Sequence, residues 1–152
     1  MVDMEVNTLK EIDAAKVMLR HTDIVFTSKE GIRVLTESGT ADEGVEEILS
    51  AGPEIVVLTR GSEGAIVFTP KDRYSTAVYD VPGRDTTGAG DCFHAAFIFG
   101  ILSDWNLQRC LEFASAAAAI LVQKIGARGG LPSLLEVQHF MKTNQKKEIY
   151  IQ

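Results

Sequence analysis

The sequence predicts an α/β fold in which a parallel β-sheet carries helices on its faces. Strand-type and helical segments alternate along the first half of the chain, which is the order that βαβ units produce. Two short apolar runs, at residues 23–26 and 54–58, are typical of buried strands, because both faces of a parallel strand are covered. Apolar residues recur every three or four positions in the segments around them, which indicates helices packed on the sheet.

The first half of the chain contains three predicted helices and three predicted strands. In order, these are a strand at 2–6, a helix at 8–19, a strand at 23–26, a short helix at 30–35, a helix at 42–49 and a strand at 54–58. Ser28 is a typical N-cap for the short helix, because its hydroxyl can accept a hydrogen bond from one of the first helical amides. Gly52 and Pro53 end the next helix, since neither residue continues a helix well.

The second half begins with a predicted hairpin and continues with helices. The hairpin strands are 64–69 and 73–78, and the helices are 88–102, 107–124 and 133–141. Ser133 and Glu136 have the spacing of a capping box at the last helix. The alanine-rich run 114–119 favours helix and permits close packing. Trp105 is expected to pack in the turn between the two long helices.

Size and charge exclude several classes of protein. A chain of 152 residues with 45% apolar residues fits one globular domain. A net charge of −6 without a basic stripe argues against nucleic-acid binding, and the chain has no apolar run long enough for a membrane span. The N-terminus lacks the pattern of a signal peptide, and Cys92 and Cys110 fit the core of a protein in a reducing compartment. The sequence therefore predicts a cytoplasmic protein.

The most informative stretch is Asp-Thr-Thr-Gly-Ala-Gly-Asp at residues 85–91, directly before a strongly apolar helix. Gly88 and Gly90 let the backbone come close to a ligand, and a helix start leaves several amides without partners. Such a turn attracts anions. Asp91 adds a carboxylate to an anion site, which makes chemical sense for a base that deprotonates a nucleophile attacking a phosphate. The stretch also fits a plain glycine-rich loop followed by a helix with an N-terminal Asp.

A second glycine-rich turn follows the strand at 54–58. Residues 59–64 read Thr-Arg-Gly-Ser-Glu-Gly, and the end of a strand in an open α/β sheet is where ligands bind. A tight hairpin turn explains the same residues. The sequence contains neither a Walker loop nor a Rossmann fingerprint.

Residues 85–91 resemble the C-terminal signature of the ribokinase-like (PfkB) family of sugar and nucleoside kinases. The resemblance implies part of a ribokinase-like three-layer α/β/α fold. It also implies roles for the residues of the signature. Asp91 would be the catalytic base on the acceptor hydroxyl, the amides of Gly88, Ala89 and Gly90 would form the anion hole for the transferred phosphoryl group, and Asp85 with the Thr87 backbone would hold a monovalent cation, K⁺.

The same resemblance implies a binding site for ATP. Four residues, Thr59, Gly61, Ser62 and Gly64, match the nucleotide-contact loop of the family. Ser115 matches the stretch that lies beside the adenine, and Gly126 begins a loop that closes the nucleotide and cation site, although a helix C-cap explains this glycine equally well.

A metal role is implied for Glu30. The family carries Asn-x-x-Glu near the metal and the phosphates, and here residues 27–30 read Thr-Ser-Lys-Glu, with Thr27 in place of the Asn. Glu30 would orient water bound to Mg²⁺, and a plain acidic residue at a helix N-terminus is the alternative. The segment 23–30 looks most like the ketohexokinase-type branch.

The resemblance implies an ATP-dependent sugar kinase, and two alternatives stay open: a nucleoside as acceptor, or a nucleotide-binding fragment without turnover. It covers residues 1–141 and only the C-terminal half of the family pattern, with 142–152 as a tail that looks frayed from residue 144. A sheet cut inside a fold exposes an unpaired edge. We therefore expect self-association through that edge, around residues 2–6.

Overall fold

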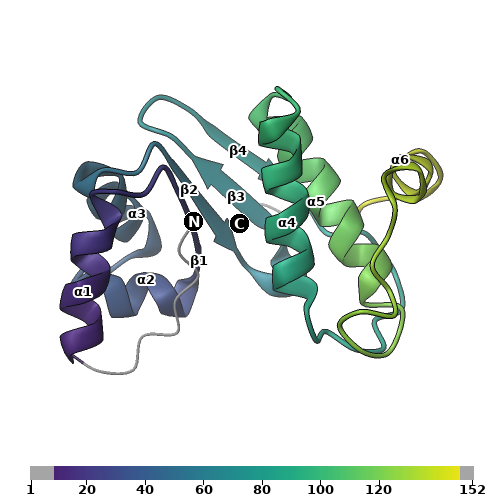
Figure 1. The fold of residues 1–152 in the computed structure, drawn as a ribbon, viewed down its shortest axis with the longest axis horizontal. Coiled ribbons are helices and arrows are strands. Elements are labelled where there is room, and N and C mark those ends of the chain that lie inside the picture. The colour runs from purple at the N-terminus through teal and green to yellow at the C-terminus, as the bar shows by residue number, and fades with distance from the viewer. Residues whose placement is uncertain (1–8, 148–152) are drawn as a thin grey trace. The chain divides into compact units, whose positions relative to one another are not determined.

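The computed structural model describes residues 9–147, which form two compact units (Figure 1). Of the described residues, the first unit comprises 9–60 and 66–73, and the second comprises 61–65 and 74–147. The predicted strand at 2–6, and with it the edge expected to mediate self-association, lies outside the described residues.

The first unit confirms the predicted alternation of helices and strands. Its elements are α1 (Leu9–Leu19), β1 (Ile24–Ser28), α2 (Lys29–Leu35), α3 (Ala41–Ala51) and β2 (Ile55–Thr59). Strands β1 and β2 are parallel, and their register runs from Ile24 opposite Ile55 to Ser28 opposite Thr59. The carboxyl ends of both strands therefore lie side by side.

Local hydrogen bonds explain where the helices of this unit begin and end. The Ser28 hydroxyl accepts a hydrogen bond from the Gly31 amide at 3.1 Å, as the sequence predicted. Thr40 and Glu43 form a capping box at the start of α3. Gly52 ends α3 with a φ of 148°, a conformation that favours glycine.

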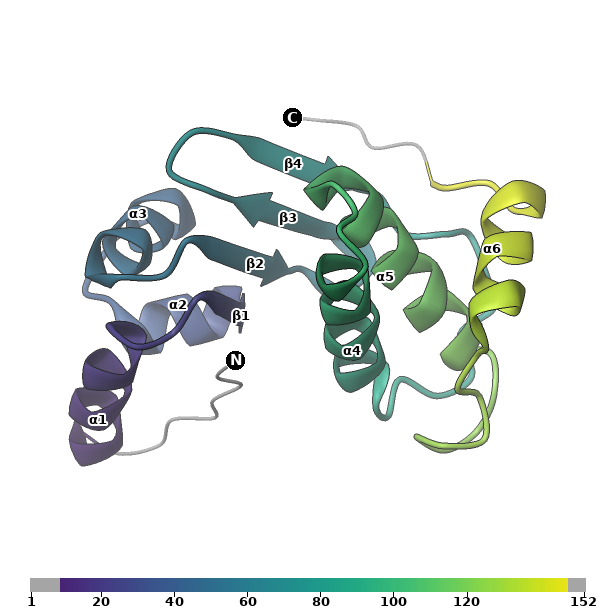
Figure 2. The same ribbon diagram turned by 45° about the horizontal axis from the view of Figure 1, so that its top comes forward.

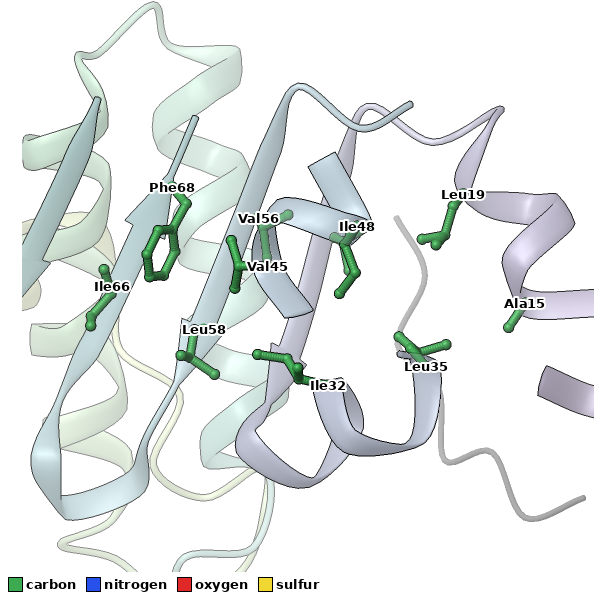
Figure 3. Packing of buried hydrophobic residues seen from close by; sticks show 11 residues of the cluster. Ala15, Leu19, Ile32, Leu35, Val45, Ile48, Val56, Leu58, Ile66 and Phe68 are labelled. Carbon is green, nitrogen blue, oxygen red and sulfur yellow. The ribbon is translucent and has the colours of Figure 1, made fainter. Parts of the chain in front are cut away.

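The core of the first unit lies between its helices and its strands (Figure 3). Ile32 of α2 and Ile48 of α3 are each 1% exposed, and they point toward Val56 and Leu58 on β2. Phe68 extends the same cluster. Full burial of one such side chain contributes roughly 1.5–3 kcal/mol, so the cluster is a substantial source of stability for the unit.

The four strands form one sheet in the order β1-β2-β3-β4, with β3 (Ala65–Phe68) and β4 (Arg73–Thr76) as neighbours. The two run in opposite directions (Figure 2). The turn between them is closed by a hydrogen bond from the Thr69 amide to the Asp72 carbonyl at 2.9 Å. The predicted hairpin is therefore confirmed, with shorter strands.

The second unit is built on three helices, α4 (Ala89–Leu102), α5 (Leu107–Leu121) and α6 (Leu134–Thr143). Helices α4 and α5 lie side by side (Figures 1 and 2), and Gly100 permits their close approach, since a Cβ there would lie 2.7 Å from the Cys110 Sγ. Cys92 and Cys110 are buried free thiols, as predicted, and burial raises the pKa of both. Trp105 packs edge-on against Phe113 between the two helices, also as predicted.

Two predictions at the C-terminal side need correction. Residues 145–147 are not frayed, because Lys146 forms an antiparallel bridge with Tyr79 and the Lys147 amide donates to the Val78 carbonyl at 2.8 Å. Helix α5 ends at Leu121 and not at Lys124. Within residues 9–147, no helix has the length and apolar character that crossing a membrane requires.

Candidate functional site

The 85–91 loop leads directly into α4. Helix α4 begins at Ala89, and its N-cap Gly88 has a left-handed backbone with a φ of 78°. Among the described residues, no side chain caps this helix. The Ala89 amide donates to the Thr86 carbonyl at 3.1 Å, while helix geometry leaves the next two amides without an acceptor inside α4. A positive helix end of this kind is suited to bind an anion.

Asp85 fastens this loop to a second one. Its Oδ1 accepts a hydrogen bond from the Thr87 amide at 2.9 Å, and its Oδ2 accepts one from the Gly126 amide at 2.8 Å. Hydrogen bonds from the Thr87 side chain, the Thr87 amide and the Gly126 amide lower the pKa of Asp85 to about 2. The carboxylate therefore stays ionised over the whole neutral range and joins segments that are 41 residues apart.

The glycines of the two loops differ in what surrounds them. A Cβ at Gly88 would lie 2.8 Å from the Cβ of Ala127, so this glycine is required by the contact between the loops. A Cβ at Gly90 or Gly126 would meet no heavy atom within 4 Å. Packing inside the unit therefore does not explain glycine at position 90, whereas the approach of a ligand to the backbone would.

Asp91 stands exposed in the first turn of α4, beside these amides. Its position allows it to reach a group bound at the end of the helix, and the partial positive charge of the helix terminus stabilises its charge. His94, one turn further, is only 9% exposed. It is therefore a buried residue of the helix and does not stand exposed as Asp91 does.

The 59–64 turn is divided between the two units. Gly61–Glu63 form one turn of 3₁₀ helix, and Ser62 is exposed. Gly64 has a φ of 91°, and a Cβ there would collide with the Thr76 carbonyl oxygen. Gly61, with a φ of 56°, faces open space. The backbone at Gly61 and Ser62 is thus accessible, while Gly64 is fixed by the hairpin.

Ser115 is buried in α5, where its hydroxyl donates to the Ala77 carbonyl at 3.2 Å. The hydroxyl proton is therefore already engaged in a hydrogen bond within the second unit. Any contact of this residue with a nucleotide would have to come from the remaining lone pairs of its oxygen or from its backbone.

The first unit gathers three further candidate groups at the carboxyl ends of its parallel strands. The Thr59 hydroxyl at the end of β2 donates to the Thr27 carbonyl at the end of β1, at 3.2 Å. Glu30 follows in the first turn of α2 and is exposed, with Arg33 at 3.8 Å as a solvent-screened ion pair. Glu30 and Thr59 are therefore placed where α/β proteins bind ligands.

The structure brings most of the predicted residues of the second unit together. Asp85, Thr87, Gly88 and Gly126 are linked by hydrogen bonds or close contact, and the loop continues into Asp91. Two supporting groups were not predicted. Ala127 packs on Gly88, and the Val122 carbonyl accepts hydrogen bonds from the amides of Arg84 at 2.7 Å and Asp85 at 3.2 Å. The Val122 carbonyl accepts these bonds directly after α5, which ends at Leu121 and not at Lys124 as predicted. No local sequence pattern predicts this role.

Comparison with known proteins gives a consistent result. The family described as "pfkB family carbohydrate kinase" matches residues 4–134. A 5-dehydro-2-deoxygluconokinase of Clostridium botulinum (strain Eklund 17B / Type B) is 35% identical over 138 residues, which cover 86% of this chain and 40% of that protein. The chain thus spans about two fifths of the length of this relative. The narrower expectation of a ketohexokinase-type branch stays a prediction.

Solved structures show the same likeness. A putative ribokinase II from E. coli, in complex with ATP and Mg²⁺, superposes with a TM-score of 0.84 at 29% identity over 88% of this chain and 43% of that one. A fructokinase double mutant from Vibrio cholerae O395, with fructose, ADP and a potassium ion bound, has a TM-score of 0.80 at 24% identity, over 87% and 44% of the two chains. The latter likeness shows the fold alone. The predicted ribokinase-like α/β fold, present in part, is thereby confirmed.

Proposed function

Since this chain belongs to the pfkB family of carbohydrate kinases, we propose that it carries the ATP-binding and phosphoryl-transfer part of an ATP-dependent sugar kinase. The whole reaction moves the γ-phosphoryl group of ATP to a sugar hydroxyl. The chain spans about two fifths of the length of its curated relative, so the acceptor of the whole reaction is part of the proposal.

The observation that carries this proposal is the uncapped start of α4 with an exposed carboxylate beside it. Phosphoryl transfer depends mainly on positioning and on stabilising the charge of the transferred group. The amides of Gly88 and Gly90 would hold that charge, and the Ala89 amide joins them only by leaving the Thr86 carbonyl. Asp91 would accept the proton of the attacking hydroxyl.

The nucleotide would lie along the accessible backbone of Gly61 and Ser62. The resemblance assigns it further contacts with Gly64 and Ser115 of the same unit, and Gly126 would belong to the loop that closes the site. This assignment is supported by the open surroundings of Gly61 and Gly126. It is also supported by the E. coli relative, whose structure holds ATP and Mg²⁺.

The residues present fit a magnesium ion held mainly by phosphates. Among residues 9–147, no cluster of three or more His, Cys, Asp or Glu side chains is arranged to bind a metal. Mg²⁺ usually keeps several waters and uses only one or two carboxylates beside substrate phosphates. Glu30, exposed in the first turn of α2, would orient one such water. When bound, the ion neutralises charge on the phosphates.

The residues present also fit a monovalent cation near Asp85. Each carboxylate oxygen of Asp85 accepts one amide hydrogen bond, which leaves lone pairs for a cation. Carbonyl oxygens of Thr87 and of the loop that begins at Gly126 would complete the oxygen ligands. When bound, K⁺ would order the two loops that Asp85 already joins.

A second function is favoured by the length of the chain. With about two fifths of its relative present, the chain would bind nucleotide without turnover of its own. The kinase and the nucleotide-binding fragment differ only in whether a bound acceptor can be phosphorylated. A kinase that takes a nucleoside in place of a sugar is a further variant of the first function.

The test begins with calorimetric titration of the 152-residue chain with a Mg·ATP analogue, in potassium buffer and in buffer without potassium. We expect one-site binding that tightens in potassium. Release of ADP is then measured with a panel of sugars, 5-dehydro-2-deoxygluconate and a nucleoside. Binding with turnover supports the kinase, and binding without turnover supports the nucleotide-binding fragment. The absence of binding in both buffers would refute the proposal.

Asp91→Asn tests the catalytic base. We expect turnover to fall by at least about a hundredfold while the affinity for the analogue stays nearly unchanged, since general-base catalysis contributes about 10²–10⁴-fold. Asp42→Asn makes the same change in the first turn of α3 and serves as the matched control. Normal turnover of the Asp91 variant would overturn the assignment.

A further inference from the structure

The segment that joins β4 to the 85–91 loop runs along α5. Side chains or carbonyls of α5 and of the residue after it hold the end of β4 and this segment at three levels. The first contact reaches the end of β4 itself, from Gln108 Nε2 to the Ser75 carbonyl at 3.4 Å. The others reach the segment after it, from Ser115 Oγ to the Ala77 carbonyl at 3.2 Å, and from the Arg84 and Asp85 amides to the Val122 carbonyl at 2.7 and 3.2 Å. The chain that leads into the 85–91 loop is thus held at several points along α5.

Residues 145–147 hold the same segment from another side. The Asp80 amide donates to the Gln145 carbonyl at 3.3 Å, and the Lys147 amide donates to the Val78 carbonyl at 2.8 Å. Between these bonds, Lys146 and Tyr79 form the antiparallel bridge. The path from β4 to the 85–91 loop is therefore enclosed between α5 and the chain that follows α6.

Glu112 connects the two sides. Its Oε1 receives Gln108 Nε2 at 2.9 Å and Lys146 Nζ at 3.1 Å. The side chains of Glu112 and Lys146 are 34% and 29% exposed, so water screens this ion pair less than it screens a surface pair. The Lys146 ammonium also stands 5.9 Å from the centre of the Tyr79 ring.

The neighbouring lysine makes a different kind of contact. Lys147 Nζ lies 3.8 Å from Asp80 Oδ1, and the two side chains are 49% and 77% exposed. An ion pair of that length and exposure contributes little. Of two consecutive lysines, only Lys146 thus ties the C-terminal segment to α5.

We propose that Glu112 and Lys146, together with the backbone pairing of residues 145–147, form a latch that positions the 85–91 loop. With the latch closed, the segment after β4 is pressed on α5, and the loop amides are held where they face a phosphoryl group. Glu112 and Lys146 are positioning residues that touch no reacting atom. This inference rests on the proposed function only for what the loop binds.

The test compares Lys146→Ala with Lys147→Ala in the full 152-residue chain. Both substitutions remove one positive charge from the same segment. The first readout is amide hydrogen exchange of peptides that cover 78–80 and 85–91, which needs no ligand. We expect Lys146→Ala to speed exchange in both peptides by about threefold to tenfold, as loss of a partly buried charged contact implies, and Lys147→Ala to leave both nearly unchanged.

The second readout is the affinity for a Mg·ATP analogue, which we expect to fall by about the same factor in Lys146→Ala. Lys146→Arg should restore both readouts, and the exchanged pair Glu112→Lys with Lys146→Glu should restore them in part. Faster exchange at 78–80 with unchanged exchange at 85–91 would overturn the latch, and so would equal effects of the two lysine variants. Absence of analogue binding by the unmodified chain would count against the proposed function alone, because the exchange readout still decides the inference.

Discussion

Helices α3 and α4 begin in opposite ways. At α3, the Thr40 side chain accepts from the Glu43 amide at 3.3 Å, and the Glu43 carboxylate accepts from the Thr40 amide at 3.2 Å. At α4, the N-cap Gly88, whose φ is 78°, has no side chain, and no other side chain in the described part of the chain caps the first turn. Helices α2, α5 and α6 also begin with a side-chain cap, from Ser28, Asn106 and Ser133, and α6 has the capping box as well.

The capped start of α3 stabilises its own helix, whereas the uncapped start of α4 is suited to bind a ligand. A capped start satisfies its own amides and stabilises its helix by about 1 kcal/mol. An uncapped start leaves amides available to a ligand, and the fold must hold it by other means. At α4 those means are the contact of Gly88 with Ala127 and the hydrogen bonds of Asp85 to Thr87 and Gly126.

The largest effect is expected from Gly88→Ala. The new Cβ would meet the Cβ of Ala127 at 2.8 Å, and alanine is strained at a φ of 78°. We expect a loss of about 2–4 kcal/mol in the free energy of unfolding, measured in urea, from left-handed strain and overpacking together. Gly88→Ala combined with Ala127→Gly should recover part of the loss. An unchanged unfolding midpoint for Gly88→Ala would show that the two loops do not need to touch.

Thr40→Ala breaks the capped start. We expect a loss of about 1 kcal/mol in the free energy of unfolding and no change in the affinity for a Mg·ATP analogue, since the cap serves only α3. Thr40→Ser keeps the hydroxyl and should behave like the unmodified chain. A variant that binds the analogue more weakly would contradict the separation between the two helix starts.

Asp85→Ala removes the carboxylate that joins the two loops, and its effect is expected to depend on pH. The pKa of Asp85 in the folded chain, about 2, lies below the ordinary value of 3.8, so the charged form stabilises the fold. The stability difference between the unmodified chain and Asp85→Ala should therefore be constant above about pH 5. It should shrink as the pH falls from about 4 to about 2.

Urea unfolding at several pH values measures this difference. Asp13→Ala, which removes an exposed carboxylate of α1, is the control. A difference for Asp85→Ala that stays constant down to pH 3 would mean that the carboxylate does not act through its charge.

The smallest change in stability is expected from Gly90→Ala. A Cβ there meets no heavy atom within 4 Å, and alanine favours helix, so the free energy of unfolding should stay within about 0.5 kcal/mol. The affinity for a Mg·ATP analogue should nevertheless fall by about tenfold, or about 1.4 kcal/mol, because the methyl group occupies the space of the ligand. Unchanged affinity would show that the anionic group of the ligand does not lie against Gly90.

Local sequence determined most of the elements. The caps at Ser28 and Ser133, the end of α3 at Gly52 and the order of helices and strands were predictable, because each depends on hydrogen bonds or apolar spacing within a few residues. The signature at 85–91 likewise pointed to the family that the comparison confirms.

Tertiary structure alone decided how the site is held. The Asp85 carboxylate meets the Gly126 amide across 41 residues, and the Ser115 hydroxyl meets the Ala77 carbonyl across 38. Lys146 pairs with Tyr79 from a segment that the sequence predicted to be a frayed tail. None of these contacts has a local pattern, because a hydrogen bond between distant residues depends on where the packing of whole helices places them. The sequence by itself therefore determined which residues stand at the start of α4, and the packing around α5 decided what holds them there.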